Sequence, residues 1–101
     1  MVKQKFLTKG IDLNVSVFLQ DLMWSMIDSM EVQKQDYLQI FKFSGISLYG
    51  RTTFQKIVHI QEQPEYKKEL VIPISDDEIF NGKVFVIDDV TYCTMLLAEE
   101  Y

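Results

Sequence analysis

The chain has 101 residues, 48% of them hydrophobic and 13% aromatic, and carries a formal net charge of −5 at pH 7. These values predict one globular domain over residues 1–101, and the acidity disfavours nucleic-acid binding because phosphate backbones are repelled. One cysteine cannot form an internal disulfide, and neither a signal-peptide pattern nor an apolar run of about 20 residues is present. We therefore expect a cytoplasmic protein that does not enter a membrane.

The first third of the chain predicts a short strand and one long amphipathic helix. The strand covers residues 6–8, and the helix runs from Val15 to Lys34 with Asp12 or Asn14 as its N-cap. Apolar residues recur at steps of three and four, so on a helix they form one stripe that faces a core. The stripe comprises Val15, Phe18, Leu19, Leu22, Met23, Met26, Ile27 and Met30. Gln20 falls on the polar side of the predicted helix.

Short runs of aromatic and β-branched residues follow from Asp36 onward and predict strands. These strands cover residues 36–44, 54–61, 69–74, 84–87 and 92–97, and we interpret residues 45–53 as a connection. The connections are too short for parallel crossovers, which need about a dozen residues. We therefore predict an α+β fold, with a mostly antiparallel sheet of five or six strands and the one long helix packed on a face.

Six stretches that together cover most of the chain carry a resemblance to known proteins. They are residues 7–11 (LTKGI), 22–28 (LMWSMID), 36–41 (DYLQIF), 59–69 (HIQEQPEYKKE), 86–89 (VIDD) and 94–101 (TMLLAEEY). In these stretches the chain resembles a family of small uncharacterised cytosolic proteins from low-GC Gram-positive bacteria and their mobile elements. The resemblance implies a cytoplasmic protein of bacterial or phage origin, and it brings no catalytic or binding residues with it.

The one histidine of the chain is the obvious candidate for catalysis. A small hydrolase or metal-dependent enzyme could use His59 with Glu62, Asp88 or Asp89, but metal sites need three or four ligands and the spacing singles none out. Neighbouring residues on a strand point to opposite faces, so Asp88 and Asp89 are better interpreted as turn residues. His59 is interpreted as a surface or half-buried residue on a polar sheet face. Cys93 is interpreted as an inert residue in an apolar run. No metal or cofactor site is predicted.

Trp24 lies outside the apolar stripe of the predicted helix. It is seven residues from Val17 and has Asp21 and Asp28 as neighbours on the same side of the helix. Because tryptophan is common at the centres of interfaces, this patch predicts a site that binds a protein partner or a second copy of the chain. The alternative is that Trp24 covers an edge of the sheet.

These observations favour a small acidic module for protein interaction or regulation, without catalysis. Two alternatives stay open. One is the enzyme that would use His59. The other is a small-ligand binder with a pocket between helix and sheet, lined by the aromatic residues Tyr37, Phe41 and Tyr92.

Overall fold

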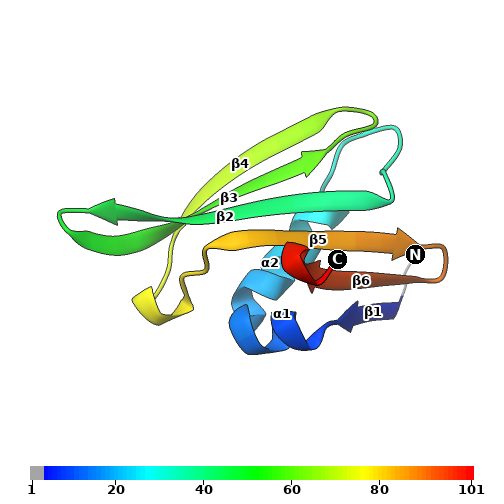
Figure 1. Ribbon diagram of the computed structural model, residues 1–101. Coiled ribbons are helices and arrows are strands. Elements are labelled where there is room, and N and C mark those ends of the chain that lie inside the picture. Colours follow the sequence, from blue (N-terminus) through cyan, green and yellow to red (C-terminus); the bar gives the residue numbers. More distant parts are fainter. Residues whose placement is uncertain (1–3) are drawn as a thin grey trace.

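The computed structural model describes residues 4–101, and for residues 51–53 it describes the backbone alone. In this part of the chain, six strands form one sheet (Figure 1). The strands are β1 (Gln4–Leu7), β2 (Leu38–Leu48), β3 (Arg51–Gln61), β4 (Tyr66–Pro73), β5 (Gly82–Asp89) and β6 (Tyr92–Leu97). Their order across the sheet is β1-β6-β5-β2-β3-β4. All neighbouring pairs are antiparallel except β1 and β6, which are parallel. The predicted α+β class and mostly antiparallel sheet are confirmed.

Two short helices, α1 (Lys9–Asn14) and α2 (Val17–Asp28), replace the one long helix predicted from the sequence. Ser16 separates them, because its backbone is extended and its hydroxyl accepts a hydrogen bond from the Leu19 N–H to cap α2. The predicted caps, Asp12 and Asn14, are therefore wrong: both lie inside α1.

The second helix ends well before the predicted Lys34. Beyond Asp28 the last carbonyls are no longer bonded by helical N–H groups. Side chains contribute instead: the Ser29 hydroxyl donates to the Met26 carbonyl at 3.2 Å, and the Gln35 amide donates at 3.1 Å to the Ile27 carbonyl, which also accepts from the Met30 N–H at 3.2 Å. The chain then runs without regular structure to β2.

The helix α2 packs its buried residues on the sheet, and the core also contains residues of α1, β2 and β3. The core includes Leu19, Met23 and Met26 from α2, with Val84, Val86 and Met95 from the sheet. The predicted stripe is only partly right. Phe18 lies about 140° around the helix axis from Met23 and is 51% exposed.

Gln20, predicted on the polar side, is buried in the structure. It lies only about 60° around the helix axis from Met23, the centre of the buried face. Its amide donates to the Val15 carbonyl at 2.8 Å, which satisfies the donor away from water.

Strands β2 and β3 form a long hairpin that projects at the left of Figure 1. Its turn is Tyr49-Gly50, with φ of 54° and 76°, between the paired residues Leu48 and Arg51. Two positive φ values are typical of a type I′ turn, which suits the twist of paired strands. The predicted connection over residues 45–53 is therefore wrong. Gly45 is paired in the sheet, and only Gly50 is used for a turn.

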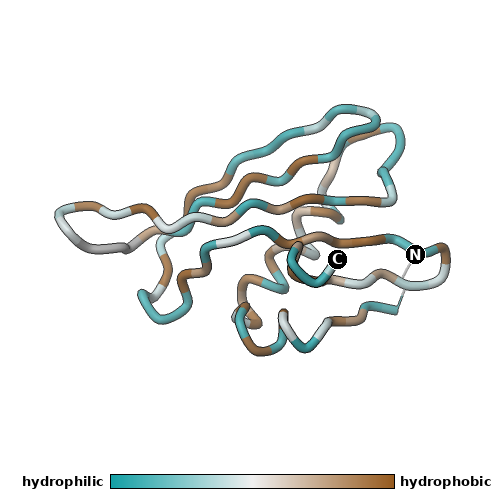
Figure 2. The backbone as a smooth tube through the Cα atoms, in the orientation of Figure 1, coloured by the Kyte–Doolittle hydropathy of each residue, from teal (hydrophilic) through white to brown (hydrophobic). Residues whose placement is uncertain are grey.

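The two faces of the sheet are covered differently. The helices lie on one face, and a short 3-10 turn, η2 (Ala98–Glu100), lies on the other beside β5 (Figure 1). A second 3-10 turn, η1 (Asp76–Glu78), leads into β5. Along the tube of Figure 2 hydrophilic and hydrophobic residues alternate in β3, whereas β5 is hydrophobic at successive positions, so both faces of the sheet receive apolar residues.

The turn η2 also holds the start of α1. The Glu100 carboxylate accepts hydrogen bonds from the Thr8 hydroxyl at 2.7 Å, the Leu97 N–H at 2.8 Å and the Gly10 N–H at 3.2 Å. These hydrogen bonds lower the pKa of Glu100, and the bond from Thr8 makes the largest contribution. A Cβ atom on Gly10 would lie 2.6 Å from the carboxylate, so this approach requires glycine.

Candidate functional site

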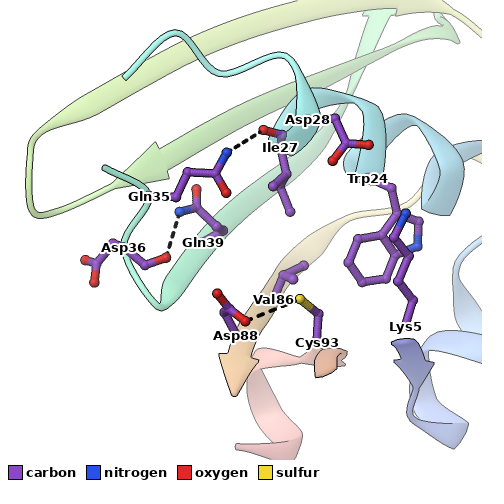
Figure 3. A pocket seen from close by; sticks show the side chains of 10 residues that line it. All are labelled: Lys5, Trp24, Ile27, Asp28, Gln35, Asp36, Gln39, Val86, Asp88 and Cys93. Carbon is purple, nitrogen blue, oxygen red and sulfur yellow. Dashed lines mark hydrogen bonds between the residues drawn. The ribbon is translucent and has the colours of Figure 1, made fainter. Parts of the chain in front are cut away.

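A cavity of about 220 Å³ opens between α2, the segment that enters β2, and strands β1, β5 and β6 (Figure 3). Its wall combines an indole, a thiol, amides and several charged groups. The lining residues are Lys5, Trp24, Ile27, Asp28, Gln35, Asp36, Gln39, Val86, Asp88 and Cys93.

One end of the cavity is formed by Trp24 and Lys5, which lie side by side in Figure 3. The Lys5 ammonium is 5.2 Å from the centre of the Trp24 ring, within the range of a cation–π interaction. Lys5 faces the helices because its neighbour Phe6 is on the opposite face of β1. The indole therefore already contacts a positive charge supplied by the chain itself.

Carboxylates contribute most of the charge around the cavity. Asp28 follows Trp24 on α2, and Asp88 lies across the cavity on β5, where its Oδ1 accepts from the Cys93 thiol at 3.7 Å. The Asp36 carboxylate instead accepts from the backbone N–H groups of Tyr37 and Gln63, so it orders the turn. Two carboxylates and an indole thus border a space suited to a positive group.

The back of the cavity is closed by a network of amides that leads to His59. The Asp36 N–H donates to Gln61 Oε1 at 2.8 Å, which identifies that atom as the oxygen. Gln39 Nε2 donates to the same oxygen at 2.7 Å, so Gln39 Oε1 is the atom that faces His59. Since an amide oxygen only accepts, His59 Nε2 carries a proton and donates over 2.7 Å.

His59 is a buried, neutral residue. Its ring stacks on Phe41 with centres 4.3 Å apart and meets the Tyr66 ring edge to face at 5.3 Å. Burial, with a smaller contribution from Lys68, lowers the pKa of His59 to about 4. Its Nδ1 has no hydrogen-bond partner among the described residues. The prediction of a surface or half-buried histidine is wrong, because the polar face of β3 is the covered one.

The hypothetical catalytic residues are not brought together around His59. Among the described side chains, His59 hydrogen-bonds to Gln39 and makes ring contacts with Phe41 and Tyr66, and it has no hydrogen bond to a carboxylate. Cys93 lies on β6, three strands away from β3, so the strands that carry the two residues are about 14 Å apart, and the register also displaces Cys93 along the strand direction. In residues 4–101, leaving out the side chains of 51–53, no three His, Cys, Asp or Glu side chains gather as a metal site.

Asp88 and Asp89 are the last two residues of β5, so the interpretation as turn residues is wrong, and they point to opposite faces of the sheet. Asp88 lines the cavity, while Asp89 lies on the face away from the helices, where the interaction of its carboxylate with the Tyr92 hydroxyl raises the pKa of Tyr92. The three aromatic residues predicted to line a ligand pocket do not share one. Tyr37 is 58% exposed, Phe41 is buried in the core, and Tyr92 is on the face away from the helices.

The predicted partner-binding residues divide into two groups. Trp24 and Asp28 line the cavity, whereas Val17 and Asp21 are exposed nearer the start of α2 and do not line it. Sequence reasoning missed Lys5 and Gln39. Gln39 shares a strand face with Phe41 and could have been recognised as inward-facing from that alternation, whereas nothing in the sequence indicates Lys5.

In the described part of the chain, both helices fall short of the length and apolar character that crossing a bilayer requires. The fold is similar to that of a protein of unknown function from Enterococcus faecalis known from a crystal structure. The TM-score is 0.78 at 21% identity, over 98% of this chain and 91% of that chain. At this identity the likeness shows the fold alone.

A family model agrees with this likeness. The model described as staphylococcal protein of unknown function (DUF960) matches residues 4–100, nearly the whole chain. No curated protein matches the chain. The resemblance to uncharacterised proteins of low-GC Gram-positive bacteria is thus confirmed, and the chain belongs to the DUF960 family of staphylococcal proteins of unknown function.

Proposed function

We propose that this chain is a small binding module without catalysis, which recognises a protein partner by receiving a cationic side chain in the cavity beside Trp24. We further propose that it works in the cytoplasm of a bacterium, encoded by the host or by a mobile element. The observation that carries the proposal is the Lys5 ammonium, 5.2 Å from the Trp24 ring in a cavity that Asp28 and Asp88 also line.

The composition of the wall suits a positive group. An indole attracts cations through its electron-rich face, and the attraction is stronger where water is partly excluded. Carboxylates bind guanidinium and ammonium groups through charge-assisted hydrogen bonds. An arginine or lysine of a partner would take the place that Lys5 holds over Trp24, with Asp28 beside it.

The size of the cavity favours a single side chain. Pockets for drug-sized ligands and cofactors usually measure about 300–1,000 Å³, and the volume here is about 220 Å³. A whole cofactor would not fit within it, but one long side chain would. The rest of the partner would then lie against the exposed surface of α2, where Val17 and Asp21 are located.

Trp24 is the one tryptophan in the chain, so its fluorescence reports directly on the cavity. We would titrate the protein with a short arginine-containing peptide and with the same peptide carrying citrulline, a neutral analogue, in place of arginine. The arginine peptide should change Trp24 emission in a saturable manner, and the citrulline peptide should not. Replacing Lys5 with Gln should strengthen binding, because the competing internal cation is removed.

Two substitutions on one helix provide the matched comparison. Asp28→Asn should weaken binding by about fivefold or more, whereas Asp21→Asn, seven residues earlier and outside the cavity, should change it by less than about twofold. Equal losses in the two variants would mean that the peptide responds only to overall charge, and the proposal would be wrong.

A further inference from the structure

The face of the sheet away from the helices is rich in apolar side chains that remain partly exposed. Register places them together across strands β3, β2 and β5. They are Leu38, Ile40, Val58, Ile60, Phe85 and Ile87, all half-buried. On β4 the same face carries Val71, which is 53% exposed. Figure 1 shows η2 beside β5 on this face, which leaves β2, β3 and β4 without a helix over them.

Lysines cross the middle of this open face. Lys42 of β2 and Lys83 of β5 are directly paired residues on neighbouring strands, and Lys56 of β3 is diagonal to Lys42. Lys67 of β4 shares the same side. Like charges placed directly opposite each other destabilise a sheet. Four lysines thus lie on this face of a chain whose formal net charge is −5.

The strand residues on this face include two acids, Glu69 of β4 and Asp89 of β5, which do not balance the four lysines. Among the described side chains, Glu69 pairs with Lys56 at 3.2 Å, and Lys42 and Lys83 form no ion pair. We propose that this open face is a docking surface for an acidic, amphipathic segment of another protein. Its apolar side would cover residues such as Ile40 and Val58, and its carboxylates would pair with Lys42 and Lys83.

Charge decides between this occupant and two others. If the face packed on the same face of a second copy, lysines would meet lysines with too few acids to pair them. A single-stranded nucleic acid would meet the lysines but also the repulsion of an acidic protein, and the apolar residues here are mainly aliphatic rather than the aromatic platforms that stack bases. An acidic segment matches both the apolar and the basic parts of the face.

The test uses fluorescence anisotropy with a labelled synthetic helical peptide that has Leu at positions i, i+3, i+4 and i+7 and Glu elsewhere. The peptide should bind the full chain, and binding should weaken as salt is raised because exposed charges are screened. A peptide with Gln in place of Glu should bind about tenfold or more weakly. Equal binding of the two peptides, or tighter binding of a poly-U oligonucleotide, would overturn the proposal.

Variants locate the site. The double variant K42E/K83E should reduce peptide affinity by about tenfold or more, while K9E/K68E, which changes the net charge equally at exposed positions off this face, should stay within about twofold. The single variant K42E creates an opposite-charge pair with Lys83, so it should bind less peptide while its melting temperature rises. If K42E lowered the melting temperature, or both double variants lost affinity equally, the proposal would fail. A chain that sediments as a dimer and binds no peptide would also overturn it.

Discussion

The two faces of strand β3 contradict the usual assignment of polar residues to water and apolar residues to the interior. On the face toward the helices, Gln55, His59 and Gln61 are fully buried. On the other face, Val58 and Ile60 are only half-buried. Alternation along a strand separates two sets of side chains, but the elements that cover the sheet decide which set is buried.

The buried glutamines are stable inside because they bond the backbone of irregular segments. Gln55 accepts from the Phe80 N–H at 2.8 Å and donates to the Phe80 carbonyl at 3.0 Å, which fixes the segment before β5. Gln61 donates to the carbonyls of Lys34 and Pro64, at 3.1 Å and 2.8 Å. One side chain thus joins the irregular segment before β2 to the β3–β4 turn. Backbone groups that lack regular partners are satisfied without water.

The largest expected effect comes from removing that link. Gln61→Leu keeps the size of the side chain but leaves four groups without their Gln61 partner, the N–H of Asp36, the amide of Gln39 and the carbonyls of Lys34 and Pro64. Since each buried unsatisfied group costs about 1–3 kcal/mol, we expect a loss of about 3–4 kcal/mol in the free energy of unfolding. Urea denaturation measures it.

Gln63→Leu is the matched control, since the Gln63 side chain is exposed two residues away. It should change the free energy of unfolding by less than about 0.5 kcal/mol. If the two variants lost similar amounts of unfolding free energy, the buried hydrogen bonds of Gln61 would not contribute to stability as proposed.

The next effect in size is a change in the free energy of unfolding with pH. Because the pKa of His59 is lowered from 6.5 to about 4, the unfolded chain binds a proton between these values that the folded chain does not. The contribution is fully present above pH 6.5 and is lost as pH falls toward 4, for a total of about 3 kcal/mol. Carboxylates titrate in part of the same range, so the comparison is with His59→Gln. That variant should show a pH dependence of stability that is flatter by this amount.

Nuclear magnetic resonance can check the same group directly. The imidazole of His59 should stay neutral, with the proton on Nε2, at pH 5.5. A histidine that titrates near 6.5 would show that the buried network is open to water.

The smallest effect is expected on the open face. Ile60→Gln places a polar group on a half-buried site, so the free energy of unfolding should fall by only about 1 kcal/mol. The same change at Ile57, which is fully buried on the other face, should cost several times more. If both substitutions lower the free energy of unfolding equally, Ile60 is buried in solution and the face away from the helices is not open.

The sequence supports the class of fold and most of the strands, because period-two patterns and turn residues depend on local chemistry. Val84 to Ile87 and residues 92–97 are strands as predicted. The break at Ser16 could not be inferred from the apolar stripe, since the stripe continues across it while the backbone does not. Residues 45–53 were misjudged because Gly45 looks like a breaker but pairs normally within the long hairpin.

The candidate site was predicted only in part. Trp24 and Asp28 were identified from helical spacing, which places them about one turn apart on the same side of α2. Lys5, Asp88 and Cys93 join them through the pairing of β1, β5 and β6, which are far apart in sequence. Such pairing depends on the order of strands in the sheet, and no local pattern in the chain encodes it.

The hydrogen bond from Gly10 to Glu100 has a consequence for how the chain folds during its synthesis. These residues are 90 positions apart, and β1 likewise pairs only with β6. On the ribosome, the first strand and helix are synthesised long before their partners, while the β2–β3–β4 hairpins contact near neighbours in sequence. Local contacts form faster than distant ones, so the middle of the sheet should assemble first. Until β6 and the last turn emerge, apolar residues of the N-terminal segment such as Ile11 are left exposed, and this interval is when the chain is most open to chaperones or to aggregation.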